Sequence, residues 1–495
     1  MNILAAARDP KLFAGWFRRG TFDAWFAFLA AAFGLPMTDD QLATFRQFTG
    51  RIDAPTQQAR EVWLIVGRRG GKSLMLAIIG VYLACFKSYR QHLQPGERAT
   101  IRIMAADKRQ ARTIFRYVSG LLNRIPMLRK MIERETADGF DLNNSTTIEI
   151  GTSSMKASRG YSFAAILADE AAFWPTDEAA EPDTEVLRAV RPGLATIPGA
   201  MLLVASSPYA KRGTLWQAYR DHYAKTGDPI LVWKADTASM NPALDKQVIA
   251  DAYADDPVAA SAEFGAEFRS DLEQYVSLEQ VLGVTSSNVS IRPYNPDLEY
   301  AAFVDAAGGS GKDSFTLAIG HRVDDMVVID RVEERMPPFS PEAVAAEFAD
   351  IIREYGLRDT WGDAYAAMFA TEAFERASIG YYRSSAVRSK LYLELLPVLN
   401  SGRIDLLDIP KLQNQLASLE RSTGRGRDSV DHRPGSHDDV SNAVAGVAWV
   451  LGTRADLAPQ PLAGRYGAVV DEERRARQTD PARLAYLEAI EGMMS

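Results

Sequence analysis

The feature that most constrains the fold is an apolar stretch that runs into a glycine-rich turn at residues 61–73. It reads Glu-Val-Trp-Leu-Ile-Val-Gly-Arg-Arg-Gly-Gly-Lys-Ser. A strand, such a turn and then a helix are typical of a loop whose backbone N–H groups surround a nucleotide phosphate. Lys72 would reach the β- and γ-phosphates, Ser73 would hold Mg²⁺, and the helix would point its positive end at the anion. The motif predicts an α/β nucleotide-binding domain.

The spacing of this loop departs from the usual one, in which four residues lie between the first glycine and Gly-Lys-Ser. Only three residues separate Gly67 from Gly71. Either Val66 takes the first position or the loop is a variant, and the turn alone would also fit a plain strand–helix connection. The residues expected to contact nucleotide are Gly67, Arg68, Arg69, Gly70, Gly71, Lys72 and Ser73.

A second motif strengthens the nucleotide interpretation. The apolar stretch from residue 164 ends in Asp169 and Glu170. Asp169 is expected to hold Mg²⁺, and Glu170 to orient or deprotonate the attacking water. A further apolar strand ends in Ser-Ser-Pro at residues 206–208, where it could sense the γ-phosphate. Arg159 is a candidate for stabilising charge on the transferred phosphoryl group, although a surface role fits it equally well.

The organisation of the chain supports two catalytic regions. Strands alternate with helices, which favours a largely parallel sheet covered on both faces. The pattern then restarts after a looser stretch. We predict five parts: a helical, aromatic-rich segment 1–60, a nucleotide domain 61–270, a linker 271–297, a second domain 298–453 and a tail 454–495. Within the nucleotide domain, residues 246–268 are expected to form one helix.

The second region carries aspartates at the ends of its predicted strands. Asp305 and Asp363 each follow a strand, and Asp438 and Asp439 open the last apolar helix. Together they could hold two divalent ions about 3.5–4 Å apart, the arrangement that cleaves phosphodiesters. Oxygen ligands favour Mg²⁺ or Mn²⁺, and with five histidines and one cysteine a zinc site is not expected. Each aspartate alone would also fit a helix cap or an ion pair.

Composition leaves the partner open. The net charge of −8 does not indicate nucleic-acid binding, but it does not exclude it, because such binding depends on local patches of charge. Basic clusters occur, and each alone would also fit a solvated surface: Arg18–Arg19, Arg68–Arg69, Lys108–Arg109–Arg112–Arg116 and Arg421–Arg425–Arg427. The apolar runs are shorter than the ~18 residues that cross a bilayer. The N-terminus lacks a signal-peptide layout, so we expect a protein that is not secreted.

Taken in order, these motifs resemble the large terminase subunit of tailed bacteriophages, over about residues 55–452. The resemblance implies an additional-strand ATPase domain followed by an RNase H-like nuclease domain. In that family, ATP hydrolysis drives double-stranded DNA into a procapsid, and the nuclease cuts concatemeric genome. Asp305 and Asp363 match the first two metal ligands of the family. For the third we expect Asp439 rather than Asp438, because it lies one residue deeper in the helix.

The same resemblance implies partners and a location. It implies a homo-oligomeric ring on the portal protein, a small terminase subunit that selects DNA, and work in the host-cell cytoplasm, transiently on the procapsid. Two alternatives stay open: a DNA-repair helicase–nuclease, and a catalytically silent DNA-binding scaffold. The first would need a second motor domain, for which the space between Pro208 and Asp305 is too short. The second is disfavoured by the intact acidic residues and Lys72.

Overall fold

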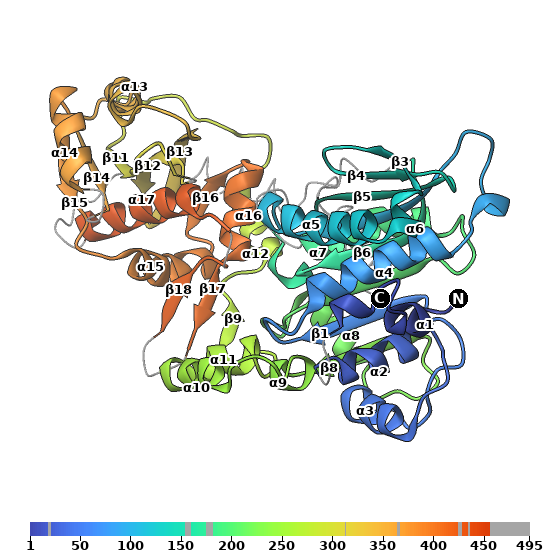
Figure 1. Cartoon of the computed structure of the whole chain (residues 1–495). Helices are drawn as coiled ribbons and strands as arrows, with labels where there is room; N and C mark the ends of the chain where they lie inside the picture. The colour runs from blue at the N-terminus through green and yellow to red at the C-terminus, as the bar shows by residue number, and fades with distance from the viewer. Residues whose placement is uncertain are drawn as a thin grey trace. The chain divides into compact units, whose positions relative to one another are not determined.

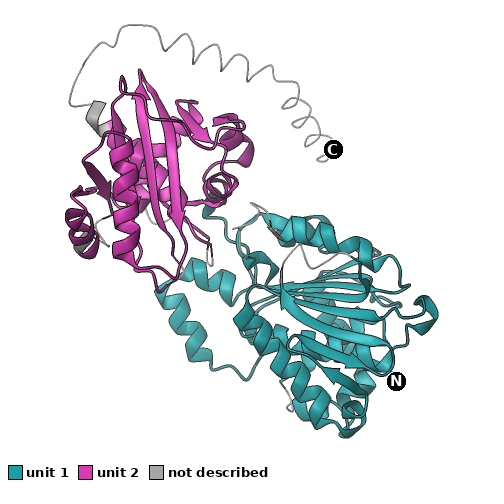
Figure 2. Cartoon of the chain, turned by 90° about the horizontal axis from the view of Figure 1, so that it is seen from above, with its two compact units in different colours: residues 1–273 teal, residues 274–495 magenta. Residues whose placement is uncertain are grey.

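The computed structural model describes residues 1–17, 21–153, 160–174, 182–311, 313–363, 367–423, 428–433 and 436–455. The chain divides into two compact units, residues 1–273 and residues 274–495 (Figure 2). Strand β9 (Leu272–Gln274) straddles the boundary between them.

Unit 1 is built on an eight-stranded sheet in the order β3-β4-β5-β2-β6-β7-β1-β8 (Figure 1). Strand β4 pairs antiparallel with both β3 and β5. All the other neighbouring pairs of this sheet are parallel. Strand β7 lies between β1 and β6, which confirms the predicted additional-strand arrangement. The strands are β1 (Glu61–Val66), β2 (Ala99–Ala105), β3 (Ile132–Glu135), β4 (Gly139–Leu142), β5 (Thr146–Thr152), β6 (Ser162–Asp169), β7 (Met201–Ser206) and β8 (Ile230–Ala235).

Helices cover both faces of this sheet because its central strands are apolar on both faces. In β1, Val62 and Leu64 enter one hydrophobic core, whereas Trp63 and Ile65 enter a second. The helices are α1 (Ile3–Arg8), α2 (Asp23–Ala32), α3 (Asp39–Thr49), α4 (Lys72–Phe86), α5 (Lys108–Arg124), α6 (Pro126–Arg129), α7 (Pro182–Val190), α8 (Gly213–His222), α9 (Thr237–Met240), α10 (Lys246–Asp255) and α11 (Pro257–Glu263).

The predicted single helix at 246–268 is wrong. The chain forms α10 and α11 instead, because Pro257 has no N–H to continue a helix. Asp256 adopts an extended conformation, and its side chain accepts hydrogen bonds from the N–H groups of Val258 and Ala259. Proline at the first helical position after such a cap starts a new helix.

The aromatic N-terminal segment packs into the core of unit 1. Phe13, Trp25, Phe28 and Phe45 are fully buried in the same cluster as β1. The ring of Phe28 meets that of Trp233 in β8, with centroids 5.5 Å apart. The aromatic residues of this segment therefore contribute to the packing of the core.

Unit 2 contains a seven-stranded sheet in the order β10-β16-β13-β12-β11-β14-β15. Strands β11, β12 and β13 form an antiparallel meander, and β14 and β15 extend it in parallel from β11. This order is that of an RNase H-like fold and confirms the predicted class. The strands are β10 (Thr285–Ser286), β11 (Tyr300–Asp305), β12 (Phe315–Val323), β13 (Met326–Arg335), β14 (Asp359–Gly362), β15 (Gly380–Arg383) and β16 (Ile404–Leu407).

Helix α17 packs across β11 and β12 and opens at the aspartates predicted to bind metal. The helices of unit 2 are α12 (Leu278–Gly283), α13 (Pro341–Glu354), α14 (Ala367–Arg376), α15 (Arg388–Asn400), α16 (Pro410–Ser418) and α17 (Asp439–Ala455). Strands β17 (Glu420–Ser422) and β18 (Ser429–Asp431) pair as a hairpin. The stretch 271–297, predicted as a linker, holds β9, α12 and β10, and most of the predicted tail, from residue 456 on, lies outside the described residues.

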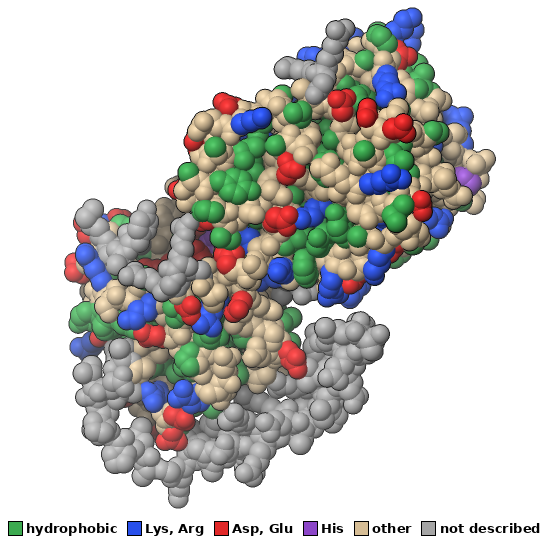
Figure 3. Space-filling model, turned by 90° about the horizontal axis from the view of Figure 1, so that it is seen from below, with side chains coloured by type: hydrophobic (Ala, Val, Ile, Leu, Met, Phe, Trp, Pro, Cys, Tyr) green, Lys and Arg blue, Asp and Glu red, His purple; other side chains and the backbone are tan. Residues whose placement is uncertain are grey.

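The surface mixes charges of both signs. On the face drawn in Figure 3, acidic and basic side chains lie among hydrophobic ones. In the part of the chain that the structure describes, no helix is both long and apolar enough to cross a membrane.

A pair of glycines in α17 tests how closely this helix packs on the sheet. A Cβ on Gly446 would clash with the Phe303 ring, whereas at Gly452 it would meet nothing within 4 Å. We expect Gly446→Ala to lower the free energy of unfolding by about 1–3 kcal/mol through overpacking. Gly452→Ala adds the same methyl group to the same helix and should raise it by up to about 1 kcal/mol. Thermal unfolding of the two variants measures the difference, and equal shifts would contradict close packing at Gly446.

Candidate active sites

The predicted nucleotide loop joins β1 to α4 in a conformation that requires glycine. Gly71 caps α4 with a φ of 102°, in the left-handed region that favours glycine. A Cβ on Gly67 would clash with Thr237 Oγ1 and would lie 2.6 Å from the carbonyl oxygen of Phe264. The loop is therefore held between the end of β1 and the segments around α9 and α11.

Lys72 places a buried ammonium group at this loop. Only 4% of its side chain is exposed. Its Nζ donates to the carbonyl of Val66 at 2.9 Å and to Ser207 Oγ at 2.8 Å, and it lies 3.1 Å from Glu170 Oε1. The ammonium group thus connects the ends of β1, β6 and β7.

Asp169 ends β6 beside the same loop and is fully buried. Its Oδ2 accepts hydrogen bonds from Ser73 Oγ at 2.6 Å and from Gln110 Nε2 at 3.1 Å. Its Oδ1 has no hydrogen-bond partner among the described residues. Burial, and then the charge of Glu170, raise the pKa of Asp169 to about 7. A buried carboxylate oxygen without a partner, next to a serine hydroxyl, fits the oxygen ligands of Mg²⁺.

Glu170 adopts a left-handed conformation with a φ of 50°. Its Oε2 accepts hydrogen bonds from Ser206 Oγ at 3.2 Å and from the N–H of Ser207 at 3.1 Å. The carboxylate is therefore held against the end of β7, where the motif predicted to sense the γ-phosphate, residues 206–208, begins. The structure brings Lys72, Ser73, Asp169 and Glu170 together, whereas Arg159 lies outside the described residues.

Sequence reasoning missed the residues that hold the loop from outside. Thr237 Oγ1 donates to the carbonyl of Arg68 at 2.8 Å, and Asn241 Nδ2 donates to that of Arg69 at 2.9 Å. Trp25 Nε1 donates to the carbonyl of Gly70 at 3.0 Å. These contacts are far apart in the sequence, so no local motif could have indicated them. The acceptors of all three hydrogen bonds are backbone carbonyl groups of the loop.

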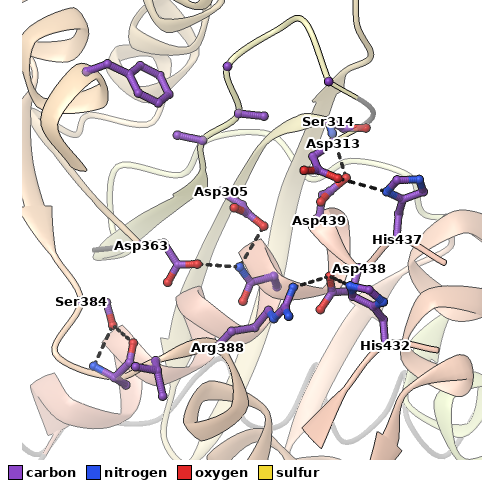
Figure 4. Close-up of a pocket in the computed structure, with 18 of the residues that line it drawn as sticks. Asp305, Asp313, Ser314, Asp363, Ser384, Arg388, His432, His437, Asp438 and Asp439 are labelled. Carbon is purple, nitrogen blue, oxygen red and sulfur yellow. Dashed lines mark hydrogen bonds and ion pairs between the residues drawn. The ribbon is translucent and has the colours of Figure 1, made fainter. Parts of the chain in front are cut away.

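The predicted aspartates of unit 2 surround a cavity of about 870 Å³ (Figure 4). Asp305 ends β11 and Asp363 follows β14, and these strands run parallel and adjacent, so the two carboxylates lie at the same edge. Asn442 of α17 joins them, because its Nδ2 donates to Asp305 Oδ2 at 2.9 Å and to Asp363 Oδ2 at 3.3 Å. No sequence signal indicates Asn442, since its role is visible only when α17 lies across β11.

Asp438 and Asp439 have different surroundings. Asp438 accepts a hydrogen bond from Arg388 at 3.2 Å and one from the Tyr392 hydroxyl at 2.9 Å, so a cation already faces it. Asp439 accepts the N–H of Ser314 at 2.8 Å.

Asp313 and His437 complete a cluster around Asp439. Candidate ligand atoms of these three residues all lie within 4.8 Å of one another. Asp439 thus lies beside a second carboxylate and an imidazole, whereas Asp438 faces the guanidinium group of Arg388, and this contrast favours Asp439 as a metal ligand.

Burial raises the pKa values of Asp305, Asp363, Asp438 and Asp439. For Asp305 the shift is large, and the charges of Asp439, Asp363 and Asp438 add to it. The pKa of Asp439 rises to about 6, and those of Asp363 and Asp438 also lie above their usual range. Carboxylates that repel one another in a half-buried pocket favour a divalent cation, and the oxygen-rich donor set fits Mg²⁺ or Mn²⁺.

The raised pKa of Asp439, caused first by burial and then by the charge of Asp438, predicts a pH-dependent gain in stability for Asp439→Asn. A folded pKa of about 6, against about 3.9 unfolded, means that stability falls as pH rises from about 4 to 6. The asparagine still accepts the Ser314 N–H but cannot ionise. In EDTA, we expect the variant to exceed wild type by about 2–3 kcal/mol at pH 8 and by little at pH 4. Thermal unfolding at both pH values checks this.

The exposed Asp297 provides the matched control, since Asp297→Asn removes one charge outside the residues that line the pocket. A gain for Asp439→Asn that is equal at both pH values would contradict the role of the raised pKa.

Comparison with known proteins identifies the first of these regions. Residues 47–206, which are less than half of the chain, match the family described as "Terminase large subunit, ATPase domain". This match confirms the resemblance to the large terminase subunit and identifies the segment as an ATPase domain of that type. A comparison with curated proteins finds no matching relative.

Among solved structures, similar ones include the HK97 bacteriophage large terminase, at 15% identity and a TM-score of 0.35, covering 79% of this chain and 91% of that one. The large terminase of a thermophilic bacteriophage has 11% identity and a TM-score of 0.37, with 88% and 100% covered. The large terminase nuclease of the thermophilic phage G20c has 15% identity and a TM-score of 0.30, with 35% and 96% covered.

Proposed function

We propose that this chain, which carries a terminase large-subunit ATPase domain, is a DNA-packaging motor that also cuts DNA with divalent metal ions. The observation that carries the proposal is the presence of two distinct sites, one built around a buried ammonium group and one built from carboxylates. The site in unit 1 is centred on the Lys72 ammonium group, which suits a nucleotide phosphate. The site in unit 2 gathers carboxylates, which suits metal ions.

In the first site, the residues of the loop divide the work of ATP hydrolysis. Lys72 carries positive charge to the phosphates, and Ser73 and Asp169 would hold Mg²⁺, which would neutralise charge on the phosphate oxygens. Glu170 takes the proton of the attacking water, since its carboxylate is held by Ser206 and the N–H of Ser207. The hydrogen bonds from Ser206 and Ser207 also place the start of the 206–208 motif in contact with this carboxylate. They support a role of the motif in coupling ATP hydrolysis to DNA movement.

In the second site, Asp305, Asp363 and Asp439 would hold two divalent ions, which would lower the pKa of a bound water and stabilise the leaving oxygen. Asn442 holds the first two carboxylates in register by donating to both. Asp438 is the alternative third ligand, although its contact with Arg388 leaves it less free to bind a cation.

The substrate and partners follow the family. We propose double-stranded DNA as the substrate, a homo-oligomeric ring on the portal protein of a procapsid, and a small terminase subunit that selects the DNA. With these partners, the protein would work in the host-cell cytoplasm, transiently on the procapsid. A DNA-repair helicase–nuclease would need a second motor domain, whereas the described residues of unit 2 form an RNase H-like sheet.

Plasmid cleavage and ATP hydrolysis by the purified full chain test the proposal. With Mn²⁺ or Mg²⁺, we expect wild type and Lys72→Ala to nick plasmid, and Asp305→Ala to lose nicking, as does wild type in EDTA. Conversely, Lys72→Ala should lose ATP hydrolysis while Asp305→Ala keeps it, because the two sites use different residues. Glu170→Gln should lower hydrolysis by about 10²–10⁴-fold, the usual contribution of a positioned base.

Asp297→Asn serves as the control for both assays. The nuclease assignment fails if wild type cuts DNA with neither metal. The motor assignment fails if wild type does not hydrolyse ATP, or if Lys72→Ala hydrolyses it at the wild-type rate.

A further inference from the structure

Helix α5 and the short helix after it carry an unusual concentration of positive charge. Residues 108–130 hold seven basic residues and no acidic one, in a chain whose net charge is −8. The basic residues are Lys108, Arg109, Arg112, Arg116, Arg124, Arg129 and Lys130. All seven are exposed. Figure 1 shows α5 lying across one face of the unit 1 sheet.

The charges gather on one side of α5 because the helix is strongly amphipathic. Its buried residues are Ala111, Ile114, Val118, Leu121 and Leu122. At 3.6 residues per turn, the basic residues of α5 fall on the opposite arc. A stacked pair of rings, Phe115 on Phe140 of β4 with centroids 5.2 Å apart, fixes the helix on the sheet.

The basic residues of this face are available to a ligand. None of Lys108, Arg109, Arg112 and Arg116 forms an ion pair with another described residue. By contrast, exposed arginines elsewhere, such as Arg353 and Arg376, face carboxylates. Unpaired like charges on one face repel one another. Binding of a polyanion would offset that repulsion, so this face favours a polyanionic ligand.

The spacing suits a nucleic-acid backbone. Lys108, Arg112 and Arg116 follow one another at every fourth residue, about 6 Å apart along the helix axis. A duplex carries one negative charge per about 1.7 Å of its axis, so several phosphates lie within reach of such a row. Lysine and arginine contacts with phosphate fix a protein on DNA without reading its sequence, as a motor requires.

The same helix also reaches the nucleotide site. Asp107 caps its first turn by accepting the N–H of Gln110. The Gln110 side chain, on the edge of the buried arc, donates to Asp169 Oδ2 at 3.1 Å. A polyanion bound at the basic face would therefore contact a helix that is hydrogen-bonded to a carboxylate of the predicted ATP site.

We infer that α5 is a duplex-DNA contact of the motor, whose basic row binds the phosphate backbone and whose Gln110 links that contact to the nucleotide site. This inference rests on the proposed function, which names DNA as the substrate but assigns no surface of unit 1 to it.

Salt-dependent binding of the full chain to a duplex of about 30 base pairs, in EDTA to prevent cutting, tests the basic row. Arg112→Gln/Arg116→Gln should weaken binding about tenfold to a hundredfold near 0.1 M salt and reduce the slope of log K against log[salt] by about 2. The control Lys225→Gln/Lys246→Gln removes two exposed positive charges elsewhere in unit 1 and should bind as wild type does. Basal ATP hydrolysis should be the same in all three proteins.

Two results would overturn the DNA contact: equal affinity and slope for the α5 variant and its control, or no binding of duplex by wild type. If wild type still hydrolyses ATP and cuts plasmid in either case, the proposed function stands and the inference alone fails.

The link through Gln110 needs a separate readout. Gln110→Ala should keep the wild-type affinity and salt slope for the duplex, since the basic row is intact. The ratio of ATP hydrolysis with and without DNA should fall toward one, because the bond from α5 to Asp169 is gone. A helix weakened in structure would lose DNA affinity as well, which separates the two explanations. A wild-type ratio of one, or an unchanged ratio in Gln110→Ala, would remove the link.

Discussion

The buried Lys72 ammonium group holds together the strand ends that form the nucleotide site. Its contacts with the carbonyl of Val66, Ser207 Oγ and Glu170 Oε1 join the ends of β1, β7 and β6. A buried charge is tolerated only when it is paired and hydrogen-bonded, so this ammonium group fixes where those strands can end relative to one another. The positions of Asp169 and Glu170, on which the proposed hydrolysis depends, follow from that constraint.

Unit 2 solves the opposite electrostatic problem. Its strand ends bring carboxylates together with an amide, Asn442, in place of an ammonium group between Asp305 and Asp363. An amide donor orients both oxygens but does not neutralise them. Burial raises the pKa of both carboxyl groups, and the charges of neighbouring aspartates add to that rise. The fold therefore stores a repulsion that a divalent cation relieves. Arg388 offsets this repulsion at Asp438 and leaves Asp439 on the unneutralised side.

The sequence predicted those parts of the sites that depend on strand ends. Parallel strands place their carboxyl ends at one edge of a sheet, so an apolar run that ends in Asp169, or in Asp305, already indicates where its side chain lies. The alternation of strands with helices likewise predicted the largely parallel sheet of unit 1. Such reasoning could not find Thr237, Asn442 or Gln110, since each acts through a hydrogen bond to a residue distant in the chain. Such contacts depend on how helices cross the sheet, which periodicity does not determine.

The charge of the whole chain is a poor guide to its partner for a related reason. The net charge of −8 includes acidic residues that line the pocket of unit 2 and others that form ion pairs with basic residues. A ligand at a surface responds to charges within about 10 Å, the screening length at 0.1 M salt, and not to the net charge. On α5 the local balance is wholly positive, because the apolar arc that anchors the helix directs every basic side chain outward. The packing that builds the core of unit 1 thus also concentrates the charge that we assign to DNA.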